Sequence, residues 1–323
     1  MHELSLSSSD EPAIPSSKPV VSVIVPTTCE MLRRELIERA IESVLSQTGA
    51  ALELILVVNG NRFDTDFLYN IRRDRRIRII QLSDGNVSRA RLSGVRAARG
   101  EFFCFLDDDD EFLEDALRAR VERMRLMSDV DVVVTNGFIL GSDEQPLVTD
   151  ALAQKIREDL PLSFQETNWF PSAASTFRKS RIEAPFFDFP YKHFEWTFLF
   201  YKLISTGKHI DYLHVPTYRV FESSPLSISK TDAYLLSYPD ILLDLLALPL
   251  SDPLRTGLKR KLPPSLNAVS QLHLRNKRIS QAWSAHLKCL AHGGWRFIPY
   301  TRAFLRAFLG RLPSFAASKA DHQ

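Results

Sequence analysis

The stretch that decides the fold is Phe102-Phe-Cys-Phe-Leu-Asp-Asp-Asp-Asp-Glu-Phe112, an apolar run that leads directly into four aspartates. Four adjacent carboxylates repel one another, so they are tolerated only where water or a cation neutralises them. After a buried strand of an open α/β sheet, they would face the crevice where such sheets bind ligands. A hard divalent ion, with a phosphate on its far side, suits such a cluster. A solvated acidic loop is the alternative.

The sequence around these aspartates alternates between short apolar strands and amphipathic helices. Strands are predicted for residues 20–26, 52–58, 77–82, 102–106 and 130–135, and helices for residues 33–46, 87–98 and 114–127. Strands that alternate with helices pair in parallel, and the helices cover both faces of the sheet. The pattern therefore predicts an α/β fold with a mostly parallel sheet flanked by helices. The carboxyl ends of its strands would bring together Pro26, Thr27, Thr28, Asn59 and the aspartates.

The composition is that of an ordinary folded protein. The chain has 323 residues, of which 45% are hydrophobic and 25% charged, enough for one large domain or two smaller ones. A net charge of +2 gives no argument for nucleic acid as a partner, and three scattered cysteines indicate a reducing compartment. Neither a signal peptide nor a transmembrane run is recognisable, so we expect a cytoplasmic protein.

Five motifs, taken together, resemble those of the GT-A-fold family 2 glycosyltransferases. They are Val21-Ser-Val-Ile-Val-Pro-Thr27, Ala40-Ile-Glu-Ser-Val-Leu-Ser-Gln47, Ala90-Arg91 with Gly94, Ala98-Arg-Gly-Glu101 and Leu106-Asp-Asp-Asp-Asp110. Their order and spacing match the family across roughly residues 20–136. The resemblance implies a GT-A fold, a nucleotide-diphosphate sugar as donor, inversion at the anomeric carbon, and Mg²⁺ or Mn²⁺ bound at a DXD motif.

The resemblance also assigns roles to the aspartates. Asp107 opens the DXD triplet near the donor ribose and, with Asp109, is implied as a metal ligand, while Asp108 fills the variable middle position on the donor side. A metal that bridges the two phosphates would stabilise the charge developing on the departing nucleoside diphosphate. Asp110 is predicted either to accept a hydrogen bond behind the metal ligands or, as the simpler interpretation, to cap the helix that starts near Glu114.

Other donor-side positions follow the family less closely. Arg91 lies in the Ala-Arg pair that opens the helix after the third strand, where a guanidinium and a helix N-terminus together suit a phosphate. The second strand usually ends in Asp-Asp-Gly-Ser, but here Val58 replaces the first aspartate and Asn59 the second. Thr28 stands where an aromatic residue often stacks on the base. These departures leave the identity of the nucleobase open.

The general base is predicted in the segment His193-Phe-Glu-Trp-Thr197. Family members carry a Glu-Asp pair at the start of a helix here, and Glu195 falls at the position of the aspartate, with Phe194 at that of the glutamate. A carboxylate opposite the leaving group would accept the proton of the acceptor hydroxyl. A glutamate favoured only by the helix dipole, and His193 as the base, are the alternatives.

The last ninety or so residues differ in character from the rest. Residues 235–248 are rich in leucine, and a helix is predicted for residues 276–289. Residues 295–312 combine aromatic and leucine side chains with four arginines. That composition is typical of a helix lying in a membrane interface, although a helix packed on the catalytic domain or a partner would look the same. We predict a flexible tail over residues 1–19, a catalytic domain over 20–230, and a C-terminal helical region over 231–323 that contacts the inner face of the membrane peripherally.

The sequence thus predicts an inverting, metal-dependent transfer of a sugar to a glycan or lipid-linked hydroxyl acceptor, in bacterial surface polysaccharide or glycolipid synthesis. A non-catalytic homologue that only binds nucleotide sugars is the first alternative, suggested by Val58 and Phe194. A nucleotidyltransferase is the second, but the residues after the first strand, Pro26-Thr-Thr-Cys-Glu30, are not the Gly-rich loop with a lysine that it would need.

Overall fold

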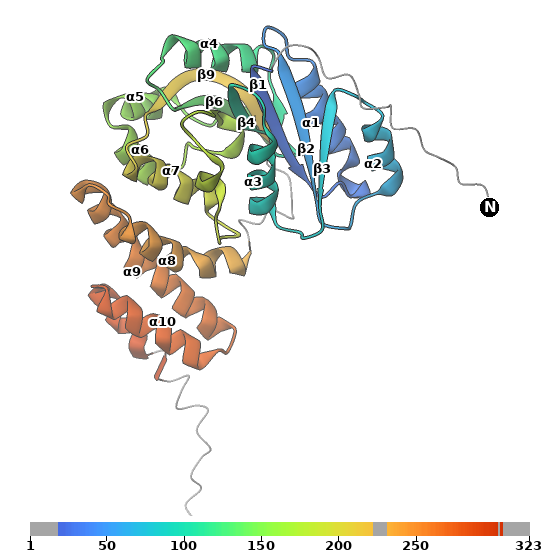
Figure 1. Ribbon diagram of the computed structural model, residues 1–323. Coiled ribbons are helices and arrows are strands. Elements are labelled where there is room, and N and C mark those ends of the chain that lie inside the picture. The colour runs from blue at the N-terminus through green and yellow to red at the C-terminus, as the bar shows by residue number, and fades with distance from the viewer. Residues whose placement is uncertain (1–18, 222–230, 303, 306–323) are drawn as a thin grey trace, which may run out of the picture. The chain divides into compact units, whose positions relative to one another are not determined.

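The computed structural model describes residues 19–221, 231–302 and 304–305 (Figure 1). The chain forms two compact units, divided between Ser224 and Pro225. The predicted tail lies outside the described residues except for its last position. Among the helices that the structure describes, none has both the length and the apolar composition required to span a membrane.

A nine-stranded sheet forms the centre of the first unit, and the strands of its first half are all parallel. In spatial order these strands are β3 (Ile77–Leu82), β2 (Leu52–Asn59), β1 (Val21–Thr27) and β4 (Phe102–Phe105). The helices between them are α1 (Arg34–Leu45), α2 (Thr65–Arg72) and α3 (Val87–Ala97). Every residue of β1 is buried, as expected for a strand covered on both faces. The predicted elements of this half are confirmed to within one residue at each end, whereas α2 was not predicted.

The second half of the sheet mixes strand directions. Its strands are β5 (Glu111–Phe112), β6 (Val132–Leu140), β7 (Glu144–Pro146), β8 (Ser175–Arg178) and β9 (Ile210–Phe221). β8 lies between β4 and β6 and is antiparallel to both, while β9 is parallel to β6. β5 and β7 pair antiparallel with β9 and β6. Six strands therefore point one way and three the other, which confirms the mostly parallel sheet, but the predicted fifth strand, β6, does not adjoin β4.

Besides the sheet and the helices named above, the first unit contains α4 (Ala116–Leu126), α5 (Asp150–Glu158), α6 (Leu160–Glu166) and α7 (Glu195–Ser205). An aromatic cluster that includes the first turn of α7 joins the two halves of the sheet. Phe103 of β4 stacks on Phe177 of β8 with ring centroids 5.1 Å apart, and Phe105 contacts Phe187 at 5.2 Å. Trp196, in the first turn of α7, packs edge-on against Phe105 at 5.4 Å. This packing holds the start of α7 near the end of β4.

The second unit is helical, as predicted. It contains α8 (Asp232–Ala247), α9 (Asp252–Arg275), α10 (Ile279–Ala291) and the 3₁₀ segment η5 (Trp295–Tyr300). The predicted interfacial helix is only partly described, because the residues from 306 onward lie outside the described part of the chain. Its beginning is a 3₁₀ segment rather than an α-helix, and it exposes Trp295, Ile298 and Tyr300 to solvent.

Candidate active site

The four aspartates follow β4 directly, and they differ in exposure. Asp108 and Asp110 are only 6% and 8% exposed. The side chains of Asp107 and Asp109 are 34% and 38% exposed. The two positions named by the DXD pattern are therefore those that a ligand can reach.

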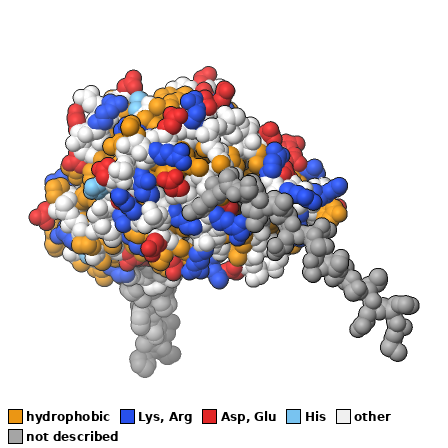
Figure 2. Space-filling model, turned by 45° about the horizontal axis from the view of Figure 1, so that its top comes forward, with side chains coloured by type: hydrophobic (Ala, Val, Ile, Leu, Met, Phe, Trp, Pro, Cys, Tyr) orange, Lys and Arg blue, Asp and Glu red, His pale blue; other side chains and the backbone are white. Residues whose placement is uncertain are grey.

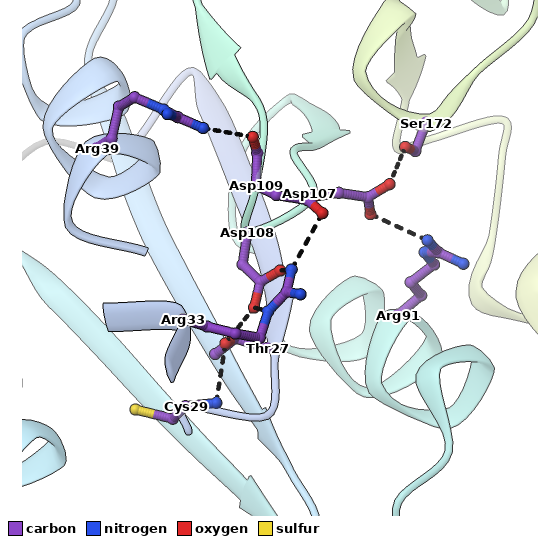
Figure 3. Close-up of polar contacts among 9 residues, drawn as sticks. All are labelled: Thr27, Cys29, Arg33, Arg39, Arg91, Asp107, Asp108, Asp109 and Ser172. Atoms are coloured by element: carbon purple, nitrogen blue, oxygen red, sulfur yellow. Dashed lines mark hydrogen bonds and ion pairs between the residues drawn. The ribbon is translucent and has the colours of Figure 1, made fainter. Parts of the chain in front are cut away.

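Protein groups hold both carboxylate oxygens of Asp107 (Figure 3). Nη2 of Arg91 donates to Oδ1 at 3.0 Å, and the hydroxyl of Ser172 donates to Oδ2 at 2.7 Å. Arg91 comes from α3 and Ser172 from the 3₁₀ turn η2 (Ser172–Ala174), which precedes β8. The orientation of the Asp107 carboxylate is thus set by elements on either side of it.

Asp108 is buried and binds protein groups on both of its carboxylate oxygens. Its Oδ2 accepts from the hydroxyl of Thr27 at 2.5 Å and from Nε of Arg33 at 3.1 Å, and its Oδ1 pairs with Nη2 of Arg33. Burial raises the pKa of Asp108, although Arg33 and Thr27 act in the opposite direction. Asp108 and Thr27, both predicted on the donor side, therefore contact each other and shape the acidic loop from within.

Asp110 does not cap the following helix, so this prediction is wrong. The strand β5 intervenes, and α4 starts at Ala116 with Asp115 at its N-cap position. Burial is the main cause that raises the pKa of Asp110 well above its usual range, and the neighbouring Asp107 and Asp109 add to it. A buried carboxyl group beside two exposed carboxylates indicates a site where negative charge is crowded.

Arg91 brings the predicted base next to the acidic loop. Its Nη1 lies 3.5 Å from Oε1 of Glu195, while its Nη2 donates to Asp107. The side chains of Arg91 and Glu195 are only 9% and 12% exposed, and the guanidinium lies over the ring of Trp196 at 5.5 Å. The buried guanidinium of Arg91 therefore lies between Asp107, the first aspartate of the loop, and Glu195, the predicted base, and it contacts both.

The backbone before Glu195 has an unusual conformation. Phe194 has a φ of 62°, in the left-handed region that bulky residues rarely adopt. Glu195 is the first residue of α7, and Trp196 directly after it is packed in the aromatic cluster. Strain of this kind persists only where surrounding contacts compensate for it, and here the packing of Trp196 and the Arg91 ion pair can do so.

The remaining predicted donor-side residues line the ends of β1 and β2. Pro26 is buried within β1, and the hydroxyl of Thr28 is buried without a partner among the described residues. Asn59 is 9% exposed, and its Oδ1 accepts from the backbone N–H of Asn86 at 2.8 Å. Since Asn86 caps α3, the Asn59 amide connects the end of β2 to the helix that carries Arg91.

Sequence reasoning missed two arginines of this site. Arg33, in the 3₁₀ turn η1 (Met31–Arg33), pairs with Asp108 and also with Asp109, whose Oδ2 lies 3.1 Å from Nη2. Arg39 of α1 donates through Nη2 to the carbonyl oxygen of Asp109 at 2.6 Å. No motif marks either residue, and the only available signal was that so many carboxylates require cations nearby.

The predicted metal ligands fit a site completed by the substrate. Within the described residues, no group of three or more His, Cys, Asp or Glu side chains could hold a metal ion. Mg²⁺ commonly uses one or two carboxylates together with substrate phosphates, and the two partly exposed carboxylates of Asp107 and Asp109 match that description. Burial raises the pKa of Asp110, and repulsion by Asp107 and Asp109 adds to it; the crowding of these carboxylates is a further reason for a cation to bind here.

Comparison with known proteins places this site in a family. Residues 22–191, more than half of the chain, match the family described as Glycosyl transferase family 2. The chain belongs to this family. The match contains the acidic loop, Arg91 and Ser172, and it ends just before Glu195.

Individual glycosyltransferases share shorter stretches with the chain. The uncharacterized glycosyltransferase EpsJ of Bacillus subtilis is 34% identical over 137 residues, which are 42% of this chain and 38% of EpsJ. The GalNAc(5)-diNAcBac-PP-undecaprenol beta-1,3-glucosyltransferase of Campylobacter jejuni is 36% identical over 113 residues, 32% of this chain and 34% of the relative. The chain therefore matches well under half the length of either glycosyltransferase.

A solved structure has a similar fold. The structure of residues 1–349 of S. aureus TarS in complex with UDP-GlcNAc superposes with a TM-score of 0.58, covering 89% of this chain and 81% of that one at 15% identity. At such low identity the likeness concerns the fold alone, and it confirms the GT-A architecture predicted from the motifs.

Proposed function

We propose that the protein transfers a sugar from a nucleotide-diphosphate sugar to a hydroxyl acceptor, with inversion at the anomeric carbon. The observation that carries this proposal is the contact of Arg91 with both Asp107 and Glu195. It combines, in one buried contact, an acidic loop suited to a diphosphate and a carboxylate suited to general base catalysis. Membership in glycosyl transferase family 2 supports the same activity.

On the donor side, Asp109 and Asp107 would hold Mg²⁺ or Mn²⁺. When bound, that ion would neutralise the charge on the leaving diphosphate. Arg91 and Ser172 keep the Asp107 carboxylate in one orientation, so the loop need not reorganise when the donor arrives. Arg39 restrains the same loop through the carbonyl of Asp109.

On the acceptor side, Glu195 would take the proton of the attacking hydroxyl. The acceptor oxygen forms a bond to the anomeric carbon while the bond to the diphosphate breaks on the opposite face, which inverts the configuration. Arg91 would hold the Glu195 carboxylate toward the reacting atoms. The non-catalytic alternative rests on Val58 and Phe194, but a glutamate at the start of α7 beside Arg91 favours catalysis.

A donor screen tests the proposal. We expect one class of nucleotide-diphosphate sugar to raise the melting temperature in the presence of Mn²⁺, and a UDP-sugar is the first to try, given the UDP-GlcNAc bound by TarS. Transfer to a hydroxyl acceptor, followed by NMR, should show the inverted anomer. A retained anomer would contradict the mechanism, and binding without transfer to any acceptor would favour the non-catalytic alternative.

For the acceptor, we propose a lipid-linked glycan at the inner face of the membrane. The C. jejuni relative is named for a PP-undecaprenol-linked saccharide. In this chain, Trp295, Ile298 and Tyr300 are 66%, 48% and 45% exposed, and aromatic side chains favour the bilayer interface. On the face in Figure 2, basic and acidic side chains are interspersed.

Vesicle binding tests the membrane contact. We expect the full-length chain to sediment with vesicles that contain anionic lipid, and salt to weaken the binding. A chain that ends before Trp295 should stay in the supernatant. If the full-length chain ignores anionic vesicles at low salt, the C-terminal segment is instead a packing or oligomerisation element.

A further inference from the structure

Arg33 contacts the acidic loop from outside it, and its position is not explained by packing. It lies in η1, the first element after β1, and this turn buries none of its residues. Its neighbours Met31 and Leu32 are 66% and 94% exposed. The Arg33 side chain nevertheless turns back toward the aspartates, so its ion pairs with Asp108 and Asp109, rather than a hydrophobic contact, determine where it lies.

The contacts of Arg33 use one edge of its guanidinium. Nε and Nη2 form a fork on the Asp108 carboxylate, and Nη2 also reaches Oδ2 of Asp109. Because Asp108 is buried and also bonded to Thr27, this fork has a fixed base. The remaining nitrogen, Nη1, has no partner among the residues that the structure describes, and 29% of the side chain is exposed. Figure 3 shows the guanidinium between Asp108 and Asp109, with this nitrogen turned away from Asp108.

Arg39 provides a contrast at the same loop. Its Nη2 is used on the carbonyl of Asp109, its Nε lies 3.6 Å from Glu111, and its guanidinium lies over the ring of Phe221 at 3.7 Å. Arg39 is thus held by a hydrogen bond, a long ion pair and a ring contact, although its side chain is 32% exposed, about as much as that of Arg33. Arg33 is held firmly on one side and open on the other, which is the arrangement of a binding group.

The charge of the loop determines what such a group would bind. An anion that approaches Asp107 and Asp109 meets two partly exposed carboxylates, so it needs a cation on its path. A guanidinium whose orientation is already set loses little entropy on binding, and an N–H group that remains free on it can donate a charge-assisted hydrogen bond to a phosphate oxygen. A neutral ligand such as the sugar would gain much less from this charge.

We propose that Arg33 is a donor-binding residue, whose Nη1 donates to a phosphate oxygen of the donor diphosphate while Nε and Nη2 stay on Asp108 and Asp109. The assignment of that phosphate to a sugar donor rests on the proposed function. The phosphate contact itself can be tested without a nucleotide or a metal.

The test is a ³¹P NMR titration of the full-length protein with inorganic pyrophosphate, in EDTA and then with Mn²⁺. In EDTA no metal can act through Asp109, so any dependence on Arg33 reports a direct contact. We expect Arg33→Gln to weaken pyrophosphate binding in EDTA about tenfold, the usual effect of losing a charge-assisted hydrogen bond. Arg34→Gln is the matched control, because Arg34 pairs with Glu38 on the surface of α1 and its loss removes the same charge.

Two results would overturn the proposal. One is equal pyrophosphate affinity of Arg33→Gln and the wild type in EDTA, and the other is a wild type that binds pyrophosphate only when Mn²⁺ is present. If Arg33→Gln does not fold, Arg33→Lys takes its place. Lysine cannot form the fork on Asp108 that orients the cation, so this variant should bind pyrophosphate about threefold more weakly than the wild type. Unchanged affinity of the lysine variant would also overturn the proposal. A wild type that binds pyrophosphate through Arg33 but transfers no sugar would instead contradict the proposed function.

Discussion

The two halves of the sheet supply the site in different ways. In the parallel half, β1 and β4 deliver Thr27 and the aspartates directly at their carboxyl ends, where one short loop carries the whole acidic cluster. In the mixed half, neither the residue that contacts Asp107 nor the one that contacts Arg91 lies in a strand. Ser172 comes from the turn before β8, and Glu195 from the first turn of α7. Regular strand ends place Thr27 and the aspartates proposed to bind the donor, whereas tertiary packing of connecting segments places Ser172 and Glu195, the proposed base.

Arg91 connects the two halves of the sheet through its side-chain contacts. It belongs to α3, which packs on the parallel half, but its guanidinium reaches Glu195 at the start of α7. The comparison therefore predicts that substitutions on the donor side should remove binding, and that substitutions on the acceptor side should remove turnover while binding remains.

The largest expected effect is at Asp109. Asp109→Ala should abolish Mn²⁺-dependent donor binding, because it removes the most exposed carboxylate of the loop, while the fold stays intact. Calorimetry with the nucleotide and Mn²⁺ measures this. Asp115→Ala, which removes a carboxylate paired with Arg118 on the surface of α4, should bind as the wild type does. Wild-type nucleotide affinity in Asp109→Ala would refute the metal assignment.

Glu195→Gln should distinguish most clearly between loss of turnover and loss of donor binding. The amide keeps the shape but cannot accept the proton, so turnover should fall about 10²- to 10⁴-fold while donor affinity holds. Initial rates and calorimetry on the same preparation measure both quantities. Glu183→Gln, at an exposed glutamate, is the control. A glutamine variant with the wild-type rate would move the base elsewhere, first to His193.

A pair of glycines tests whether the halves unfold together. A Cβ on Gly94 would lie 2.3 Å from Cγ2 of Ile24 in the parallel half, and one on Gly137 would lie 2.4 Å from the ring of Tyr218 in the mixed half. Each alanine variant should lose about 1–3 kcal/mol of unfolding free energy through overpacking. Gly85→Ala, with no heavy atom within 4 Å of the added Cβ, is the control. In chemical denaturation, one transition shifted by either variant means a cooperative unit, whereas two separate transitions would show independent halves.

The smallest expected effect is at Asp110. Burial is the main cause that raises the pKa of Asp110 in the folded state, so folding favours the protonated carboxyl group. The contribution of this group to the free energy of unfolding is therefore complete below the ordinary pKa of 3.8, and it is lost as the pH rises through the raised pKa. Asparagine cannot ionise, so Asp110→Asn without metal should be the more stable protein at neutral pH, by about 1 kcal/mol. The gain should shrink toward acidic pH. A variant that is less stable than the wild type at neutral pH would show that the ionised carboxylate has a partner there.

Much of the parallel half could be predicted from the sequence, because its signals are local. Apolar runs and helical spacing gave the strands and helices to within a residue, and the aspartates after β4 were located at the sheet edge correctly. The same reasoning missed β8, because a four-residue strand has too few residues to show a period. It also could not show that this strand separates β4 from β6, since antiparallel insertion depends on pairing between distant segments.

The sequence by itself determined the α/β pattern, the family and the acidic loop, because periodicity and motif order are properties of neighbouring residues. Only the tertiary structure decided which aspartates are accessible, and it also decided which arginines neutralise them. Arg33 meets Asp108 across 75 positions of sequence, and Thr27 meets it across 81. Burial of Asp108 and Asp110 and the ion pair from Arg91 to Glu195 likewise arise only when distant segments pack, since the energy of a charge depends on its surroundings in space.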